Sequence, residues 1–270
     1  MPASPTPAES AATLILRIAP DELRASLAVP PGDATEPLDV NVTLSGDTPQ
    51  ARLASLEAAV YDHQRLLERY AATQVIIDTR LVSIIPAQAA PQALPLLRLA
   101  IPEEELHEAV VCLPATDNAA VAVGLRREAA AFLHRTFPEA VIHHPLELLA
   151  TYFCSRFTAG GNGRRMYINV RRGISDILVL DRAQLLHAVS YRTMAPADTA
   201  YYCFATLRAL GIDPAGVEIF VAGDTGARNA VMGILREYAP TVMPVIISPA
   251  SMGAGAADLP LDMKILPLCV

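Results

Sequence analysis

Lysine is almost absent from this sequence of 270 residues, because Lys264 is the only one among 21 basic residues. A Walker phosphate loop requires a Gly-Lys-Ser/Thr motif, a protein kinase requires its strand lysine, and a Schiff-base enzyme requires a buried amine. Lys264 stands in the segment LDMKIL near the C-terminus, and no glycine loop precedes it. The lysine content therefore argues against these three enzyme classes.

Clusters of metal-ligating residues are also missing. No CxxC pair occurs, so a zinc site of the usual spacing is not expected, and the cysteines are predicted to be buried reduced thiols. His143 and His144 are adjacent in a strand-like segment, where neighbouring side chains point to opposite faces, and we interpret them as structural. The four cysteines are Cys112, Cys154, Cys203 and Cys269.

Long apolar runs and an excess of positive charge are absent as well. No uninterrupted apolar stretch reaches the length of about 18 residues that a membrane helix needs, so no membrane span is predicted. The net charge of −7 and the pI near 5.4 argue against a protein that coats nucleic acid. The segment MPASPTPAESAAT lacks a basic start and an apolar core, so no signal peptide is predicted and the cytoplasm is the expected location.

What the sequence does contain is enough apolar material for substantial cores, with 52% hydrophobic and 18% charged residues. Residues 1–12 are rich in Pro, Ala and Ser and are expected to form a disordered tail. Three alternating segments then predict strands: TLILRIA, LRASLAV and LDVNVTL, within residues 13–44. A helix is predicted from Thr48 to Tyr70, followed by a strand at Gln74–Thr79.

The same order of elements returns after the glycine-rich segment 159–163. MYINVR, ISDILVLD and LLHAVSY predict three strands, residues 196–210 predict a helix that ends at Gly211, and VEIFVAG predicts a buried strand. The pattern β-β-β-α-β thus occurs twice, at 13–79 and 166–223. This repeat predicts a duplicated α/β domain with a first half at 13–158 and a second half at 166–270.

Two such copies resemble the actin-like ATPase fold, which includes actin, hexokinases and the heat-shock chaperone ATPases. The whole chain is also similar to an uncharacterised bacterial family of this fold, found mainly in Bacteroidetes. The resemblance rests on LILRIAPDELRASL, VYDHQRLLERYAATQVIIDT, FPEAVIHH, MYINVRRGISDILVLDRAQLLHAVSYRTMAPADTAYYCFATLRALGI and VEIFVAG. It implies two ribonuclease H-like halves, each a mixed sheet flanked by helices, around a cleft. It implies no particular activity.

Active members of that superfamily hold ATP with two β-hairpin turns and a glycine-rich strand end. Glycines let backbone N–H groups approach the phosphates, and a carboxylate holds the magnesium ion. The first turn, at Arg17–Glu22, has no glycine and contains Pro20, which has no N–H group. Asp21 and Glu22 would repel a phosphate. We therefore expect the first phosphate loop to be lost.

The second turn corresponds to Asn169–Asp176, where active members have Asp-x-Gly-Gly-Gly-x-Thr-Asp. Asn169 replaces the carboxylate, and Arg171 and Arg172 stand where the backbone should approach a phosphate; only Gly173, Ser175 and Asp176 are retained. One interpretation makes the two arginines a substitute anion clamp, since guanidinium groups suit phosphate. The favoured interpretation is that they are solvated turn residues.

The third position is better retained. Gly223, Asp224 and Gly226 lie between a strand and a helix start, where backbone N–H groups and the helix dipole favour an anion or an adenosine. A lone glycine turn at such a place is also typical of tight packing alone. The candidate cleft or nucleotide site thus comprises Arg171, Arg172, Gly173, Asp176, Gly223, Asp224 and Gly226.

The loss of both phosphate turns favours a catalytically degenerate actin-like protein that acts as a scaffold or adaptor for a protein partner. The alternative is a divergent nucleotide-binding ATPase or kinase that uses the cleft, and a third hypothesis is a small-ligand sensor without hydrolysis. No catalytic residue and no metal site is predicted. No cofactor is predicted beyond weak binding of magnesium-ATP, and no motif indicates a particular partner or an oligomeric state.

Overall fold

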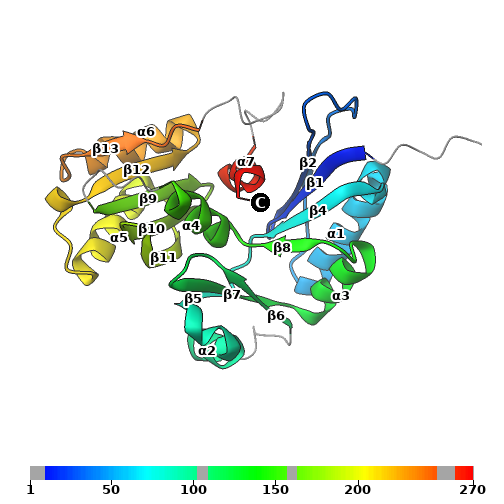
Figure 1. Ribbon diagram of the computed structural model, residues 1–270, viewed down its shortest axis with the longest axis horizontal. Helices are drawn as coiled ribbons and strands as arrows, with labels where there is room; N and C mark the ends of the chain where they lie inside the picture. Colours follow the sequence, from blue (N-terminus) through cyan, green and yellow to red (C-terminus); the bar gives the residue numbers. More distant parts are fainter. Residues whose placement is uncertain (1–9, 102–108, 157–162, 248–258, 270) are drawn as a thin grey trace, which may run out of the picture.

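The computed structural model describes residues 10–101, 109–156, 163–247 and 259–269. Within these ranges the chain forms seven α-helices and thirteen β-strands. Two five-stranded sheets lie side by side, and a smaller three-stranded sheet lies below them in the view of Figure 1. This is the mixed α/β architecture that the sequence pattern predicts.

The first sheet has the strand order β3-β2-β1-β4-β8. Strand β2 is antiparallel to its neighbours β1 and β3, whereas β4 runs parallel to β1 and β8 runs parallel to β4. Strand β2 alternates in part between buried and half-buried positions, whereas β1 carries the consecutive buried residues Leu14, Ile15 and Leu16, as expected for a central strand with both faces in a core. The bounds are β1 Ser10–Ile18, β2 Glu22–Ala28, β3 Asp39–Thr43, β4 Tyr70–Ile77 and β8 Val141–His143.

The start of β1 corrects one prediction from the sequence. Residues 1–12 were expected to be a disordered tail, but β1 begins at Ser10 and Ala12 is fully buried. Pairing with β4, where Ser10 lies opposite Tyr70, extends the strand beyond its alternating part. Residues 1–9 of the expected tail lie outside the described residues.

The second sheet repeats the plan of the first, with the order β11-β10-β9-β12-β13. Strands β9, β10 and β11 are antiparallel, and β12 and β13 run parallel to β9 and β12. When the strands of each sheet are counted along the chain, both sheets have the spatial order third, second, first, fourth, fifth, as a duplication requires. The bounds are β9 Arg164–Arg171, β10 Ile174–Asp181, β11 Gln184–Arg192, β12 Glu218–Gly223 and β13 Val242–Pro244.

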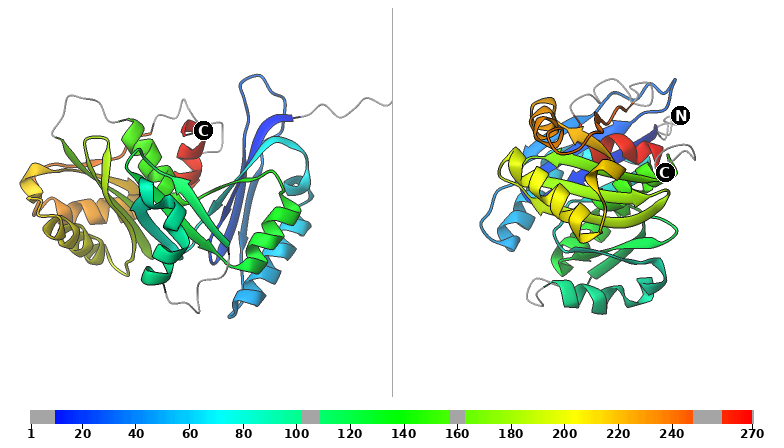
Figure 2. Two further views of the ribbon diagram at one scale, coloured as in Figure 1. Left: turned by 60° about the horizontal axis from the view of Figure 1, so that its bottom comes forward. Right: turned by 90° about the vertical axis from the view of Figure 1, so that its left-hand side faces the viewer.

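The third sheet lies outside the duplicated pattern that the sequence predicts. It has the order β5-β7-β6 and is antiparallel throughout. Helix α2 covers it with a small core of its own, and the right-hand view of Figure 2 places both to one side of the larger sheets. The bounds are β5 Val82–Pro86, β6 Ala109–Pro114, β7 Ala119–Leu125 and α2 Ala93–Ala100.

Local capping sets where the remaining helices begin and end. Thr48 accepts a hydrogen bond from Ala51 N–H at the start of α1, and Asp198 accepts bonds from Met194 and Ala195 N–H at the start of α5. Gly211, at φ 66°, follows α5 as the sequence predicts. The bounds are α1 Pro49–Asp62, α3 Arg127–Thr136, α4 Pro145–Ser155, α5 Pro196–Ala209, α6 Thr225–Leu235 and α7 Leu261–Ile265. Among the described residues, no helix is long and apolar enough to cross a membrane.

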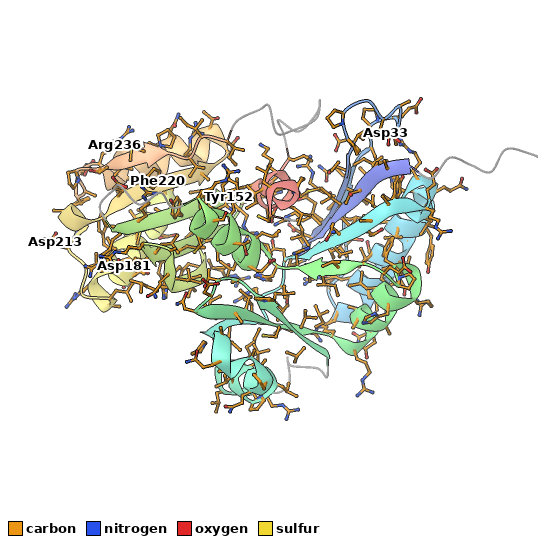
Figure 3. All side chains as sticks on the ribbon, in the orientation of Figure 1. Asp33, Tyr152, Asp181, Asp213, Phe220 and Arg236 are labelled. Carbon is orange, nitrogen blue, oxygen red and sulfur yellow. The ribbon has the colours of Figure 1, made fainter. Side chains whose placement is uncertain are left out.

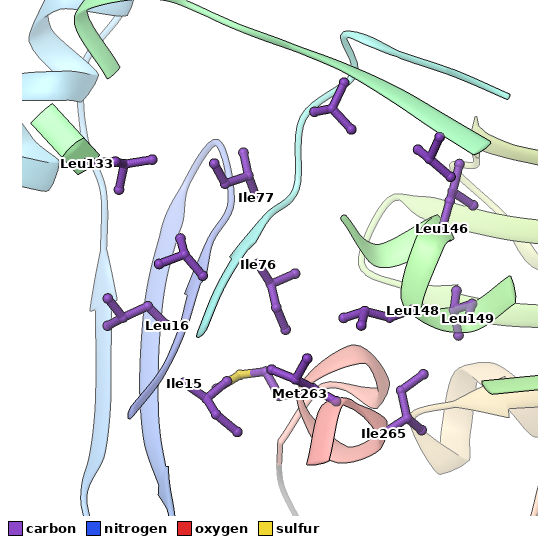
Figure 4. Packing of buried hydrophobic residues seen from close by; sticks show 14 of the residues in the cluster. Ile15, Leu16, Ile76, Ile77, Leu133, Leu146, Leu148, Leu149, Met263 and Ile265 are labelled. Carbon is purple, nitrogen blue, oxygen red and sulfur yellow. The ribbon is translucent and has the colours of Figure 1, made fainter. Parts of the chain in front are cut away.

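Two helices join the halves through one continuous core. Helix α4 is buried on nearly all sides, which is typical of a helix inside a core. Helix α7, which the sequence assigned to the second half, packs instead in the core that contains the first sheet. Figure 4 shows Met263 of α7 beside Ile15 and Ile76 of the first sheet, with Leu148 of α4 next to them. The end of the chain therefore returns to the first half.

An aromatic stack fixes α4 to the second sheet. The ring of Phe153 stacks on Tyr167 of β9 with centroids 3.8 Å apart, and Tyr167 stacks on Phe220 of β12 at 5.1 Å. Tyr152 meets Phe153 edge to face at 5.2 Å. Figure 3 labels Tyr152 and Phe220, the two ends of this stack. Aromatic pairs with centroids about 4.5–7 Å apart, such as Tyr152–Phe153 and Tyr167–Phe220, add about 0.5–1.5 kcal/mol each beyond the area that they bury.

Candidate functional site

A large cleft of about 1520 Å³ lies between the two halves. Its walls come from the β1–β2 turn, the β9–β10 turn, the junction of β12 with α6, and the segment that leads into α7. These include all three places where active members of the superfamily would hold a nucleotide. Whether this chain can hold a nucleotide therefore depends on the residues that line this cleft.

The β1–β2 turn is closed by its own backbone rather than arranged for a ligand. Ala19 N–H donates to the carbonyl of Glu22 at 2.8 Å, and the carbonyl of Asp21 accepts from Leu44 N–H at 2.9 Å. The side chain of Glu22 lies 3.4 Å from Arg24, and that of Asp21 is exposed in the cleft wall. The turn thus presents a carboxylate, not N–H donors, to the cleft.

Arg17, the residue before the last of β1, lies buried at the cleft floor. Its Nε donates to Asp262 of α7 at 2.8 Å, and its Nη2 donates to Asp78 at 2.7 Å. Asp78 directly follows β4, and its N–H group donates to the carbonyl of Ile18 at the end of β1. Arg17 therefore links the first sheet to the C-terminal helix, and it fills the space at the end of β1 with a guanidinium group.

The β9–β10 hairpin surrounds a second buried carboxylate, Asp176, which has no exposed surface. Arg171 donates to it twice, from Nε and from Nη2, each at 2.8 Å. Asn169 donates to it at 3.0 Å, and Ser190 of β11 donates to it at 2.7 Å. Each carboxylate oxygen accepts two of these four bonds, so the roughly four lone-pair positions of Asp176 are all occupied.

Arg171 also reaches across the cleft floor, where its Nη1 donates to Asp78 of the first half. The solvated-turn interpretation is therefore wrong for Arg171, whose side chain is only 13% exposed. Its place is the last position of β9, from which the side chain points inward. Arg172 lies in the turn itself, is exposed and lines the cleft, and Gly173 completes the turn at φ 70°.

These contacts form one network across the two halves, with the members Arg17, Asp78, Arg171, Asp176 and Asp262. Burial by itself lowers the pKa of Arg17 and of Arg171, but the neighbouring carboxylates outweigh it, and both pKa values lie above the ordinary arginine value. Burial likewise acts to raise the pKa of Asp176, but the charge of Arg171 and the donated hydrogen bonds outweigh it and hold that pKa below its usual range. Arg17, Arg171 and Asp176 are thus charged at neutral pH.

The third position shows a packing reason for its glycine. Gly223 ends β12 at φ +123°, and a Cβ atom there would lie 2.3 Å from the carbonyl oxygen of Val170 in β9. Asp224 caps α6 by accepting a hydrogen bond from Gly226 N–H at 3.2 Å. The carboxylate of the chain itself therefore occupies part of the helix start that would otherwise attract an anion.

The structure places five of the seven residues of the predicted site in the wall of the cleft, and Gly226, whose N–H group donates to Asp224 at the start of α6, is not among the residues that line it. The five that line it are Arg171, Arg172, Gly173, Gly223 and Asp224, whereas Asp176 lies beneath Arg171. The sequence analysis missed Asp78 and Asp262. A signal existed for Asp78, because an acidic residue directly follows the buried run VII of a strand parallel to β1. Asp262 had no such signal, since its contact with Arg17 spans 245 positions.

The predicted structural histidines both hold α4 in place. His143 is hydrogen-bonded to Gln74 of β4 and to Glu147 of α4. His144 accepts from Leu146 N–H through Nδ1 at 3.1 Å and donates from Nε2 to the carbonyl of Thr79 at 3.1 Å. Within the described part of the chain, no three His, Cys, Asp or Glu side chains are grouped so that they could hold a metal ion.

Comparison with solved structures identifies the fold. A Bacteroides thetaiotaomicron protein with an actin-like ATPase fold and unknown function is similar over 97% of both chains, with a TM-score of 0.79 and 22% identity. The PilM-PilN type IV pilus biogenesis complex contains a chain that is similar with a TM-score of 0.58 and 11% identity, covering 95% of this chain and 96% of that one. The chain therefore has the actin-like ATPase fold.

The comparison with curated proteins gave no match. A family model, by contrast, matches residues 5–242, which is most of the chain and includes both large sheets up to the start of β13. Its description is "Protein of unknown function (DUF3822)". The chain belongs to this family, DUF3822, and within it carries an actin-like ATPase fold whose cleft floor is closed by arginine–carboxylate pairs.

Proposed function

We propose that this protein is a catalytically inactive actin-like fold that acts as a scaffold or adaptor through contacts with other proteins. One observation carries the proposal. The three carboxylates at the cleft floor, Asp78, Asp176 and Asp262, are each bound by Arg17 or Arg171. The charged side chains at the cleft floor are therefore paired with one another.

Phosphoryl transfer depends on a metal ion and backbone donors that stabilise charge on the transferring group. A magnesium ion at Asp176 would have to displace hydrogen bonds from Arg171, Asn169 or Ser190, because no acceptor position is free. It would also have to approach two guanidinium groups of like charge. The network thus opposes metal binding at the point where the chemistry would take place.

The similarity to the PilM-PilN complex supports a role in protein assembly, because that structure is a complex of two proteins. The support extends only to the capacity of the fold, since the identity is 11%. Two halves joined by buried helices have large outer surfaces that partner proteins can contact. Such binding requires no ATP turnover.

The second candidate is a divergent nucleotide-binding ATPase or kinase. It is favoured by the size of the cleft, about 1520 Å³, and by Gly223 and Asp224 in its wall. Binding through this junction alone would give an affinity of about millimolar, near −4 kcal/mol. Weak binding of magnesium-ATP is therefore compatible with the scaffold proposal, and turnover is not.

The test is a thermal melting curve of the full chain with and without saturating magnesium-ATP, together with a phosphate-release assay. We expect no turnover and at most a small shift of Tm at millimolar ATP. Stabilisation at micromolar ATP with turnover that Asp176→Ala abolishes would replace the scaffold proposal by the enzyme. Turnover that Asp176→Ala leaves unchanged would indicate a contaminating ATPase.

A further inference from the structure

The cleft differs in charge from the rest of the molecule. Among the described residues that line it, nine are basic and four are acidic. Asp176 and Asp262 lie buried beneath this lining, so nine basic residues face six acidic ones at the cleft, and the other 12 basic and 22 acidic residues lie elsewhere in the sequence. A chain with a net charge of −7 therefore carries a positively charged cleft. Such a cleft, between low-dielectric walls, concentrates the field and attracts anions.

The acidic side chains of the cleft are mostly engaged already. Asp78 is bound by both buried arginines, Asp224 caps α6, and Glu22 lies beside Arg24. Asp21 is the remaining acidic residue among those that line the cleft in the described part of the chain. The excess of positive charge is therefore not neutralised within the cleft.

Three exposed arginines carry half of this available charge. Arg172 lies in the β9–β10 turn, and Arg192 ends β11 opposite Ile174 on β10, so both lie at the same end of adjacent strands. Arg80 follows β4 on the side of the first half. Within the described ranges, none of the three forms an ion pair. They approach the cleft from both of its walls.

A fourth arginine supplies an independent observation. Arg228 of α6 lines the cleft, and its Nε atom is buried without a hydrogen-bond partner among the described residues. A buried donor without a partner costs about 1–3 kcal/mol, more for a charged group. An anion that entered the cleft beside α6 would remove this cost.

We propose that the cleft binds a short acidic segment, rich in Asp and Glu, of a partner protein. This rests on the proposed function and names the chemistry of the partner. The volume of about 1520 Å³ exceeds the roughly 300–1,000 Å³ that is usual for small-molecule pockets, so a chain segment fits better than a single small anion. Carboxylates would pair with Arg80, Arg172 and Arg192 without displacing the buried network.

Nucleic acid is a poorer occupant for two physical reasons. A long polyanion would extend beyond the cleft and meet the acidic remainder of the molecule, which would repel it. Single-stranded bases also require aromatic side chains on which to stack, and Tyr191 is the aromatic residue among the described cleft-lining residues. A short acidic peptide can remain inside the positively charged region and needs no stacking.

The experiment measures fluorescence anisotropy of a labelled octaglutamate peptide with the full chain at low and high salt. We expect binding that weakens as salt rises, no binding of a Gly-Ser peptide of equal length, and a loss of about tenfold or more in Arg172→Glu/Arg192→Glu. Arg80→Glu on the opposite wall should also weaken binding. The matched control is Arg98→Glu/Arg208→Glu, which changes the charge equally at exposed positions outside the cleft.

The inference is overturned if the cleft variants bind as the wild type does, or if the control variant loses as much affinity. It is also overturned if a labelled octathymidylate binds as tightly as octaglutamate, since nucleic acid would then be the occupant. Phosphate release on the same samples tests the proposed function separately. If the peptide binds and ATP is also turned over, only the scaffold proposal is refuted. If the peptide does not bind and ATP is not turned over, only the acidic-segment inference is refuted.

Discussion

At the scale of single residues, Arg17 and Arg171 supply the positive charge that three carboxylates at the cleft floor require. A buried ion pair adds little net stability relative to apolar residues of similar size, because removing both charges from water is costly. Breaking such a pair is expensive, because one charge remains buried without a partner. The network is therefore best understood as a constraint that holds two halves in register.

The first prediction concerns Arg171→Met. This change leaves Asp176 fully buried without its main partner, and we expect the free energy of unfolding to fall by about 3–5 kcal/mol. Urea unfolding measures it. The control is Arg164→Met at the other end of β9, whose pair with Asp181 is largely exposed, and which should cost less than about 1 kcal/mol. Equal losses of unfolding free energy in the two variants would show that the buried network contributes no more to stability than the ion pair of Arg164 with Asp181.

The second prediction concerns pH and His144. Burial holds the pKa of His144 below its ordinary value, so the folded chain keeps the ring neutral. The unfolded chain binds a proton there below about pH 6.5, so it binds more protons than the folded chain and stability falls as pH drops below that value. Protonation of Nδ1 would also remove the acceptor for Leu146 N–H at the start of α4.

His144→Asn keeps a side-chain acceptor at this cap and removes the titration. Its free energy of unfolding should therefore decline less than that of the wild type between pH 7 and about pH 5. Part of the decline should remain, because burial also lowers the pKa of His187. The exposed His134→Asn serves as the control and should follow the wild type. An identical pH profile for His144→Asn and wild type would contradict the assignment.

At the scale of elements, the junction of β12 with α6 is decided by backbone contact. The end of β12 packs so closely on Val170 of β9 that only glycine fits at position 223. In active members of the fold a glycine at this place serves a nucleotide, whereas here the same residue type has a demonstrable packing role. The glycine alone is therefore weak support for nucleotide binding.

The third prediction follows from this contact. Gly223→Ala should destabilise the protein by more than about 2 kcal/mol, because the added Cβ would lie 2.3 Å from a carbonyl oxygen and φ is +123°. Gly233→Ala within α6 meets no atom within 4 Å and should stabilise the chain by about 0.5–1 kcal/mol. Chemical denaturation of both variants checks the pair. A mild effect at position 223 would mean that the β9 hairpin can move away.

At the scale of the whole molecule, α4 and α7 unite the two halves into one core. Helix α7 and the residue that follows it bring Met263, Ile265 and Leu266 into the cluster that also contains Leu178 and Leu180 of the second sheet. Asp262 adds its bond to Arg17 from the same short helix. Neither half is therefore independent of the C-terminal segment.

The fourth prediction is that the full chain unfolds in one cooperative transition, whereas a chain ending at residue 258 does not. Loss of the segment that contains α7 removes apolar contacts between the halves and leaves Arg17 without Asp262. We therefore expect a lower Tm and a separate transition for each half. Differential scanning calorimetry measures both.

Ile265→Asp places a charge at a fully buried position of the intact chain and should give the same result. The control is Leu99→Asp on α2, because Leu99 is 85% exposed and should tolerate the change. A single unchanged transition in the truncated chain would show that α7 is not required to join the halves.

Much of this architecture follows from the order of residues alone. Short apolar segments indicate β1, β2 and β9 to β11, and local signals such as Thr48 and Gly211 specify helix ends, because each depends on neighbours within a few positions. The repetition of these elements indicates a duplicated α/β fold, and the actin-like similarity supports it. The loss of glycine from the first turn is also visible in the sequence.

Only the tertiary structure decides which contacts form where active members of the fold would hold a nucleotide. The pairs of Arg17 with Asp262 and of Arg171 with Asp78 join residues 245 and 93 positions apart, and no local pattern specifies such contacts. The same holds for the inward direction of Arg171, the return of α7 to the first core, and the gathering of nine basic residues around one cleft in an acidic protein. Sequence determines which groups are present, whereas packing determines which charges meet, because ion pairing depends on distance in space and on burial.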